Sequence, residues 1–227
     1  MPPVRDYDGA RGRIGGVNRW WVAGVASLGL SAVLAVLAQA FKHDWLPPEI
    51  SFSQYGVGPA GFLFSLWVVS VVAAPLCFLR FRPAGWLPAV LLWIAAAGAV
   101  VMAVVRTDPS GLQQSWNSRV HTTGSVVLLA FLPFGICLGL AKARRRWQVL
   151  AWLLLLAAAV SLTLLLFAAA GYDSAGLGPQ KSWAFWQTVA ILAEIAMVVI
   201  YAAGVRSIPA PDEVEDSAAG VADVRPG

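Results

Sequence analysis

The stretch Leu153–Val160 reads LLLLAAAV and decides the fold class of this chain. It lies inside a longer apolar run, Trp147–Ala170, that contains no charged residue. About 20 apolar residues are the length that an α-helix needs to cross a hydrocarbon core about 30 Å thick. A closed β-barrel is the other structure that spans membranes, but its strands alternate apolar and polar residues, and this stretch does not. The sequence therefore predicts a membrane-spanning helix here.

Five further runs of similar length predict an all-α fold, a polytopic integral membrane bundle of six transmembrane helices. The chain is 59% hydrophobic and 12% charged, whereas a soluble domain is about 25% charged. Polar segments 1–19 and 208–227 flank this membrane domain of residues 20–207, and both are predicted to be disordered cytoplasmic tails, the second one acidic. The predicted spans are Trp20–Phe41, Ala60–Leu79, Leu87–Val105, His121–Leu140, Trp147–Ala170 and Trp183–Ala203.

The first span also has features of a secretory signal peptide, because arginines precede an apolar stretch that ends in Ala38-Gln39-Ala40. The stretch is longer than the roughly 7–15 apolar residues of a signal peptide. We therefore expect a retained anchor. Cleavage would leave five spans and would not change which side each remaining loop faces.

The distribution of lysine and arginine predicts the orientation. Twelve of the 16 lie in the N-terminal segment, the two short loops Arg80–Trp86 and Ala141–Arg146, and the C-terminal segment. We therefore expect both termini in the cytoplasm and a multi-pass protein of the inner (plasma) membrane. The net charge of +4 reflects this bias, and no nucleic-acid partner is expected. The outer loops are then Lys42–Pro59, Arg106–Val120 and Gly171–Ser182.

These three outer loops hold every acidic residue between spans and, with the start of the fourth span, both histidines. Asp108 closes the third span and His121 opens the fourth, so the two should lie at similar depth at the facing ends of one hairpin. Asp108 also begins an Asp-Pro-Ser-Gly turn, which leaves a structural role open beside a ligand-binding or catalytic one. His121 could anchor its helix or titrate near neutral pH. The candidate outer pocket consists of Ser51, Arg106, Asp108, Arg119 and His121.

Glu194 lies near the middle of the sixth span, with no Lys, Arg or His at that depth in any span. An ionisable group there costs about 2.5–3.5 kcal/mol on insertion scales, so we expect a neutral side chain. Its expected hydrogen-bond partners are Ser31, Ser161 or Thr163 on neighbouring spans. Two roles stay open, a functional acid and a neutral group that joins helices.

Three short motifs carry a resemblance: Ile50-Ser51 followed by Gly56, Thr107-Asp108-Pro109, and His121. With the six-span plan over about residues 20–205, they resemble the bacterial membrane family catalogued as domain of unknown function 998 (DUF998). In a common form of that family a second histidine lies close to the first, whereas Gly124 and Ser125 follow here. The Pro-x-Ile-Ser motif followed by Gly and Pro is remotely similar to the damage-regulated autophagy modulator superfamily. That similarity implies lipid handling.

The sequence favours a non-catalytic membrane protein whose outward-facing polar pocket binds a lipid headgroup, a small solute or a partner protein. One alternative is a small proton-coupled transporter that uses Glu194. The other is an outer-face metal-dependent hydrolase with His121, Asp108 and His43 or Asp44 as ligands, since catalytic zinc takes three protein ligands. We expect no resident cofactor or metal. The expected partners are the lipid bilayer and a lipid or small-molecule ligand. The oligomeric state is left open.

Overall fold

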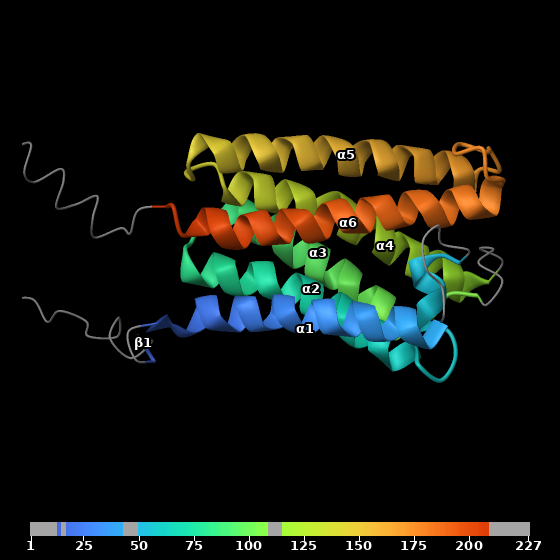
Figure 1. Cartoon of the computed structure of the whole chain (residues 1–227), viewed down its shortest axis with the longest axis horizontal. Coiled ribbons are helices and arrows are strands. Elements are labelled where there is room, and N and C mark those ends of the chain that lie inside the picture. The colour runs from blue at the N-terminus through green and yellow to red at the C-terminus, as the bar shows by residue number, and fades with distance from the viewer. Residues whose placement is uncertain (1–12, 15–16, 43–49, 109–114, 209–227) are drawn as a thin grey trace, which may run out of the picture.

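The computed structural model describes residues 13–14, 17–42, 50–108 and 115–208 (Figure 1). Six helices dominate it, and all six are long and apolar enough to cross a membrane. The prediction of an all-α, six-span bundle is confirmed. Most of both predicted tails, together with His43 and Asp44, lies outside the described residues. The helices are α1 Arg19–Lys42, α2 Gly61–Phe81, α3 Trp86–Val104, α4 Trp116–Gly139, α5 Arg145–Ala169 and α6 Pro179–Val205.

Three shorter elements accompany the six helices. The 3-10 helix η2, Phe52–Gly56, lies between α1 and α2. The strands β1, Arg13–Ile14, and β2, Val17–Asn18, pair antiparallel just before α1. Two residues on each side make this pair a turn-like feature, so the fold class is unchanged.

The fourth and sixth helices begin at least four residues earlier than the predicted spans, whereas the other four helix starts differ from the prediction by one or two residues. The fourth was predicted from His121, but α4 begins at Trp116 because the Ser115 hydroxyl caps it and accepts the Ser118 N–H at 3.1 Å. The sixth was predicted from Trp183, but α6 begins at Pro179, where proline suits the first turn of a helix. Hydropathy locates the apolar part of a helix, whereas capping residues set its end. His121 is therefore inside a helix and not at its start.

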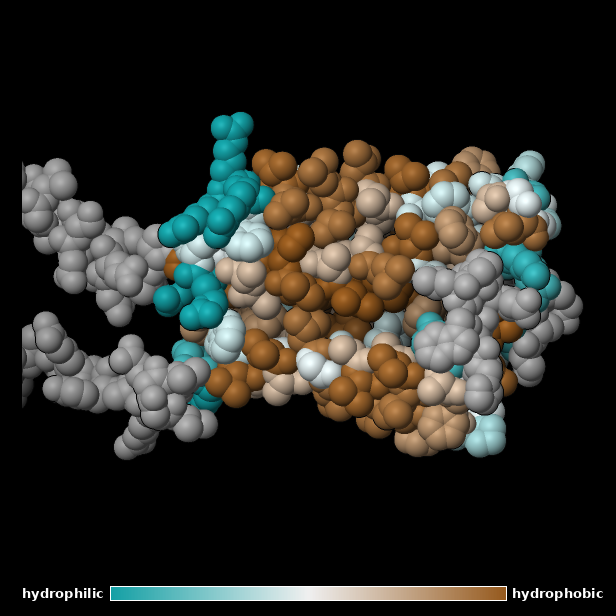
Figure 2. All heavy atoms as spheres, viewed as in Figure 1, coloured by the Kyte–Doolittle hydropathy of each residue, from teal (hydrophilic) through white to brown (hydrophobic). Residues whose placement is uncertain are grey.

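The six helices run alongside one another, so the bundle has two distinct ends (Figure 1). At one end α1 begins, α6 ends, and the short arginine-rich connections α2–α3 and α4–α5 lie; we call it the terminus end. At the other, the loop end, lie η2 and the longer connections α1–α2, α3–α4 and α5–α6. On the face of the bundle seen in Figure 2, apolar side chains cover the middle and hydrophilic side chains lie at the terminus end. The grouping of loops by end agrees with the one expected from the sequence.

Helices α3 and α4 approach most closely at a pair of glycines. A Cβ atom placed on Gly98 would lie 2.7 Å from the carbonyl oxygen of Gly124, and one on Gly124 would lie 2.9 Å from that of Gly98. Only glycine fits at such a backbone contact, as at other close helix crossings in membranes. This crossing sets the spacing of the α3–α4 hairpin, and therefore the geometry of the residues at its loop end.

Candidate functional site

The loop end of the α3–α4 hairpin is held by three hydrogen-bonded pairs, which we call the α3–α4 clamp. The Asp108 carboxylate accepts the Ser115 hydroxyl at 2.6 Å and the Ser115 N–H at 3.0 Å. The hydroxyls of Thr107 and Ser118 lie 3.0 Å apart. Nδ1 of His121 lies 2.5 Å from the Val105 carbonyl oxygen. Since Ser115 is also the cap of α4, Asp108 positions the first turn of that helix.

His121 is inside the bundle, with 1% of its surface exposed. Because a carbonyl oxygen can only accept, Nδ1 carries a proton and donates it to Val105. Nε2 is buried and has no hydrogen-bond partner among the described residues. The imidazole stacks on Phe64 of α2, with ring centroids 6.1 Å apart. The ring therefore joins three helices at the loop end.

Ser51 lies next to η2, the segment that packs on α2. It is buried beside η2, its N–H donates to Gln54 at 2.7 Å, and its hydroxyl lies 3.0 Å from that of Ser53. Phe52 of η2 packs on Trp67 of α2, with centroids 5.3 Å apart. The contacts of Ser51 therefore stabilise the start of η2.

The five candidate pocket residues do not surround one cavity that the structure describes. Asp108 and His121 belong to the α3–α4 clamp, Ser51 belongs to the η2 segment, and the side chains of Arg106 and Arg119 are exposed. Within the described ranges, no group of three or more His, Cys, Asp or Glu side chains could hold a metal ion. His43, the remaining candidate metal ligand, is outside those ranges.

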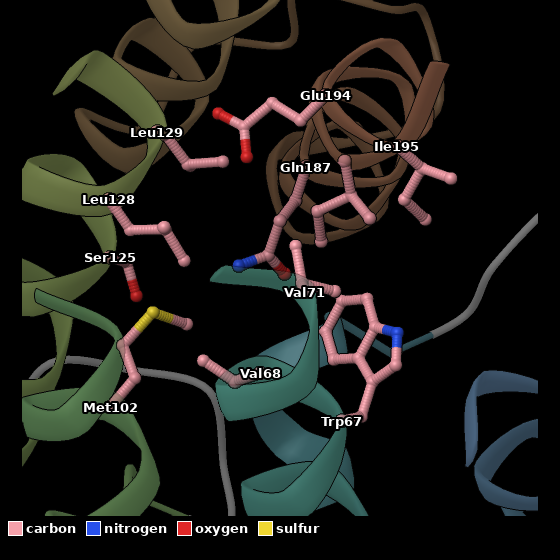
Figure 3. Close-up of a pocket in the computed structure, with 11 residues that line it drawn as sticks. Trp67, Val68, Val71, Met102, Ser125, Leu128, Leu129, Gln187, Glu194 and Ile195 are labelled. Atoms are coloured by element: carbon pink, nitrogen blue, oxygen red, sulfur yellow. The ribbon is translucent and has the colours of Figure 1, made fainter. Parts of the chain in front are cut away.

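Two small cavities lie between the helices in the loop-end half of the bundle. The first, the middle cavity, lies between α2, α3, α4 and α6, and its polar side chains are Ser125, Gln187, Glu194 and the Trp67 indole (Figure 3). The second, the loop-end cavity, lies between η2, α4, α5 and α6 and includes Ser53, Thr122 and Trp183. Each offers about 20 Å³ to the centre of a water-sized sphere. That volume is enough for about one water molecule.

Glu194 borders the middle cavity and is 3% exposed. Figure 3 shows its carboxyl group extending from α6 toward Leu129 of α4. Its Oε1 atom has no hydrogen-bond partner in the described part of the chain. The expected pairing with a neighbouring hydroxyl is wrong. Each candidate donates to its own helix instead: Ser31 to Leu28, Ser161 to Ala157 and Thr163 to Ala159.

Gln187 is the cavity residue that the sequence analysis missed. It lies on α6 seven residues before Glu194, two helical turns away on the same face. It is 4% exposed, and its Oε1 atom also lacks a partner among the described residues. Figure 3 shows its amide group pointing between α2 and α4, toward Ser125. The seven-residue spacing of two polar residues in an apolar span is the signal that could have identified it.

Asp173 has a different surrounding, in the exposed loop between α5 and α6. It accepts the Ser182 hydroxyl at 2.7 Å and the Leu177 N–H at 2.9 Å. These bonds favour the ionised form, the Ser182 hydroxyl most of all, and hold the pKa of the carboxyl below its usual value of 3.8. Asp173 therefore joins the loop to the first turn of α6.

Both connections that carry an acid among the described residues, α3–α4 and α5–α6, thus use it to hold a helix start. Three of the described side-chain atoms that lack partners, Trp67 Nε1, Gln187 Oε1 and Glu194 Oε1, belong to residues that line the middle cavity.

Comparison with known proteins gives one match. A family model described as "Protein of unknown function (DUF998)" matches residues 25–204. No curated protein and no solved structure matches the chain. The family match covers all of α2, α3, α4 and α5 and nearly all of α6. The chain of six membrane-length helices therefore belongs to the DUF998 family, proteins of unknown function.

Proposed function

We propose that this protein is a non-catalytic membrane protein that binds a small hydrogen-bonding ligand in the loop-end half of its bundle. The observation that carries the proposal is the middle cavity, where the Oε1 atoms of Gln187 and Glu194 are buried without partners among the described residues. An unpaired buried polar group costs about 1–3 kcal/mol, so a ligand that pairs with it gains that free energy on binding. Ser125 adds a hydroxyl to the same cavity.

Cavity size selects among the three ligand classes that the sequence left open. Each cavity offers about 20 Å³ to the centre of a water-sized sphere, which admits a group about the size of one water molecule and excludes a protein side chain. A small solute fits best, or the tip of a lipid headgroup that enters from the loop end. The remote similarity to the damage-regulated autophagy modulator superfamily favours the lipid.

The predicted pocket residues keep a role in this proposal, as the frame of the site. Asp108 and His121 hold the start of α4, the helix that contributes Ser125 and Thr122 to the two cavities. Arg106 and Arg119 have exposed side chains at the same end and would attract an anionic headgroup. We expect them to change how fast a ligand associates.

Native mass spectrometry of the purified protein tests the binding. Wild type should carry a bound species of fixed mass, and Gln187→Leu should lose it. Thr188→Val is the matched control, because Thr188 is buried on the same helix and its hydroxyl donates only to Ala184 at 2.9 Å. Equal retention by Gln187→Leu and wild type would contradict the proposal.

A second candidate, proton-coupled transport, is favoured by one further observation. The row of buried polar residues on α6 continues from Gln187 and Glu194 to Tyr201, whose hydroxyl also lacks a partner within the described ranges. Residues seven apart lie on one face of a helix, so these three groups line the bundle interior toward the terminus end. Glu194→Gln should then abolish uptake coupled to a proton gradient in proteoliposomes, whereas Thr188→Val should not. Unchanged uptake in Glu194→Gln would remove the transport role.

No observation favours the third candidate, the hydrolase, because Asp108 and His121 are engaged in the α3–α4 clamp.

We propose the bacterial plasma membrane as the location, with the terminus end in the cytoplasm. The support is the excess of arginine and lysine at that end. Fusing a reporter that is active only in the cytoplasm to the C-terminus should give an active fusion. The same reporter inserted in the α5–α6 loop should be inactive, and the reverse result would invert the topology.

A further inference from the structure

We propose that Glu194 is a proton-binding site that exchanges its proton with the loop end only, by way of the middle and loop-end cavities and the Gln187 side chain between them. The inference rests on the same cavities as the proposed function, but it concerns protons and requires no other ligand. It concerns the conformation that the structure shows, in which Glu194 does not pass its proton on to the terminus end.

The two cavities are neighbours that share part of their walls. Both are lined by Ser125, Leu129 and Gln187. One extends to Glu194, and the other extends to Ser53 and Thr122 at the loop end. Along α6 the path runs from Trp183 to Glu194, which is about 16 Å at 1.5 Å per residue. It therefore covers the loop-end half of the bundle.

Water molecules and side-chain oxygens along this path can conduct a proton. Each cavity is large enough for about one water molecule. The Ser125 hydroxyl and the unpartnered oxygens of Gln187 and Glu194 offer hydrogen bonds to such waters. A proton from a water in the loop-end cavity would pass to the water in the middle cavity and then to the Glu194 carboxylate. The reverse order returns it, and no bond other than O–H forms or breaks.

The bundle is closely packed on the terminus-end side of Glu194. The next residues that face inward on α6, Met197 and Tyr201, are completely buried. Leu132 and Ile136 of α4 and Phe78 of α2 are also 0% exposed and lie in the same core cluster. This packing extends from Glu194 toward Val205, about 16 Å of helix. Apart from the Tyr201 hydroxyl, the described side chains that a proton would meet on that side are apolar.

The charged and titratable groups around Glu194 are few. Apart from the arginines and lysines near helix ends, η2 and the helices that pack on α6 carry few titratable groups. His121 is on the loop-end side of Ser125, and its Nδ1 proton is engaged by Val105. Glu194 therefore has no neighbouring cation at its own depth to fix its protonation state. The titratable groups on these elements and on α6 are His121, Cys137, Cys77, Tyr55 and Tyr201.

Infrared difference spectroscopy of oriented proteoliposomes tests the inference. The carbonyl band of the protonated carboxyl is assigned to Glu194 by its loss in Glu194→Gln. A pH step on the loop-end side should change this band, and the same step on the terminus-end side should change it at least tenfold more slowly. Gln187→Leu should slow the loop-end response at least tenfold, while Thr188→Val should leave it unchanged.

Three results would overturn the inference: equal responses from the two sides, no response from either, or a wild-type rate in Gln187→Leu. Ser125→Ala provides a second variant if Gln187→Leu does not fold, and it should also slow the loop-end response. Because no ligand is added, one-sided exchange can be present when native mass spectrometry finds no bound species. The converse also holds, so the two proposals can fail separately.

Discussion

The two halves of this bundle are built from the same six helices but are stabilised in different ways. In the terminus-end half, aromatic rings fill the space between helices. Phe78 and Tyr201 meet edge to face at 6.1 Å, and Gly24 and Gly139 lie directly against these rings. In the loop-end half, hydrogen bonds between loops and helix starts hold the helices, and two cavities remain between them.

The closely packed half therefore contributes mainly to stability, and the clamped half leaves room for the proposed ligand site. Close packing leaves no room for a ligand, whereas a clamp at the helix ends fixes geometry and leaves space below it. At the terminus end, cations lie over aromatic rings at the surface, such as Arg206 over Trp21 at 4.9 Å and Arg146 over Trp147 at 4.7 Å. The cavities, the unpartnered oxygens of Gln187 and Glu194, and most of the family motif residues lie in the other half.

The largest effect is expected in the packed half, for Gly24→Leu. A Cβ atom on Gly24 would overlap the ring of Phe78, which is itself 0% exposed and packed among core residues. Overpacking of this kind typically costs about 1–3 kcal/mol, occasionally more, and we expect the upper end. Thermal unfolding in detergent measures it. Gly29→Leu is the matched control on the same helix, because no atom lies within 4 Å of its Cβ position.

A loss of less than about 0.5 kcal/mol for Gly24→Leu, similar to an ordinary surface substitution, would show that the terminus-end half can adjust. The contrast between the halves would then not hold.

A smaller effect is expected in the clamped half, for His121→Ala. The substitution removes the donor to the Val105 carbonyl and the ring that stacks on Phe64, and it leaves a buried carbonyl oxygen unpaired. We expect a loss of about 2 kcal/mol, mostly from the unpaired group. Thr123→Val is the control, because Thr123 is exposed on the same helix and its hydroxyl donates only to Arg119 of that helix.

The same variant sharpens the comparison when the cavity is also measured. If His121 acts only through the α3–α4 clamp, ligand retention should fall in proportion to the loss of folded protein. Loss of retention in fully folded His121→Ala would instead give the histidine a direct role in binding.

Ser115→Ala should have a still smaller effect, about 1 kcal/mol, which is typical for loss of a helix cap. The Ser115 hydroxyl accepts the Ser118 N–H and donates to Asp108, so the first turn of α4 loses both contacts. Hydrogen exchange of the amides in that turn measures the change, with Ser161→Ala as control because its hydroxyl bonds only within α5. Unchanged exchange in Ser115→Ala would mean that the rest of the clamp is sufficient.

Much of the fold could be predicted because hydrocarbon thickness and apolar length fix each span independently of the others. The helix starts at Trp116 and Pro179 were missed because caps are local polar features, which hydropathy does not measure. Asp108 and His121 were correctly placed on one hairpin, yet their partners could not be identified. Those partners are a backbone carbonyl and a serine outside the motifs.

The cavity could not be predicted for a related reason. Ser125 and Gln187 are far apart in the sequence and meet only because α4 and α6 pack in this arrangement. Gly98 and Gly124 set the α3–α4 crossing, and neither glycine belongs to a spacing motif that indicates a partner helix. The Glu194 partners were mispredicted because Ser31, Ser161 and Thr163 can satisfy their hydroxyls within their own helices. The sequence predicts how far along its span each residue lies. It does not predict which neighbouring helix each face of a span contacts.

The smallest effect is a pH dependence confined to the clamped half. Hydrogen bonds from Ser182 and nearby backbone N–H groups hold the pKa of Asp173 below its usual value of 3.8. A carboxyl whose pKa is lowered by folding stabilises the folded loop above its unfolded pKa, and that contribution is lost as the pH falls through the folded pKa. Protection of the α5–α6 loop from proteolysis should therefore decrease below about pH 4 in wild type. Asp173→Asn should show weaker protection at neutral pH and little further change with acid. The packed terminus end has no described acid to protonate, so equal acid sensitivity at both ends would remove the distinction between the two halves.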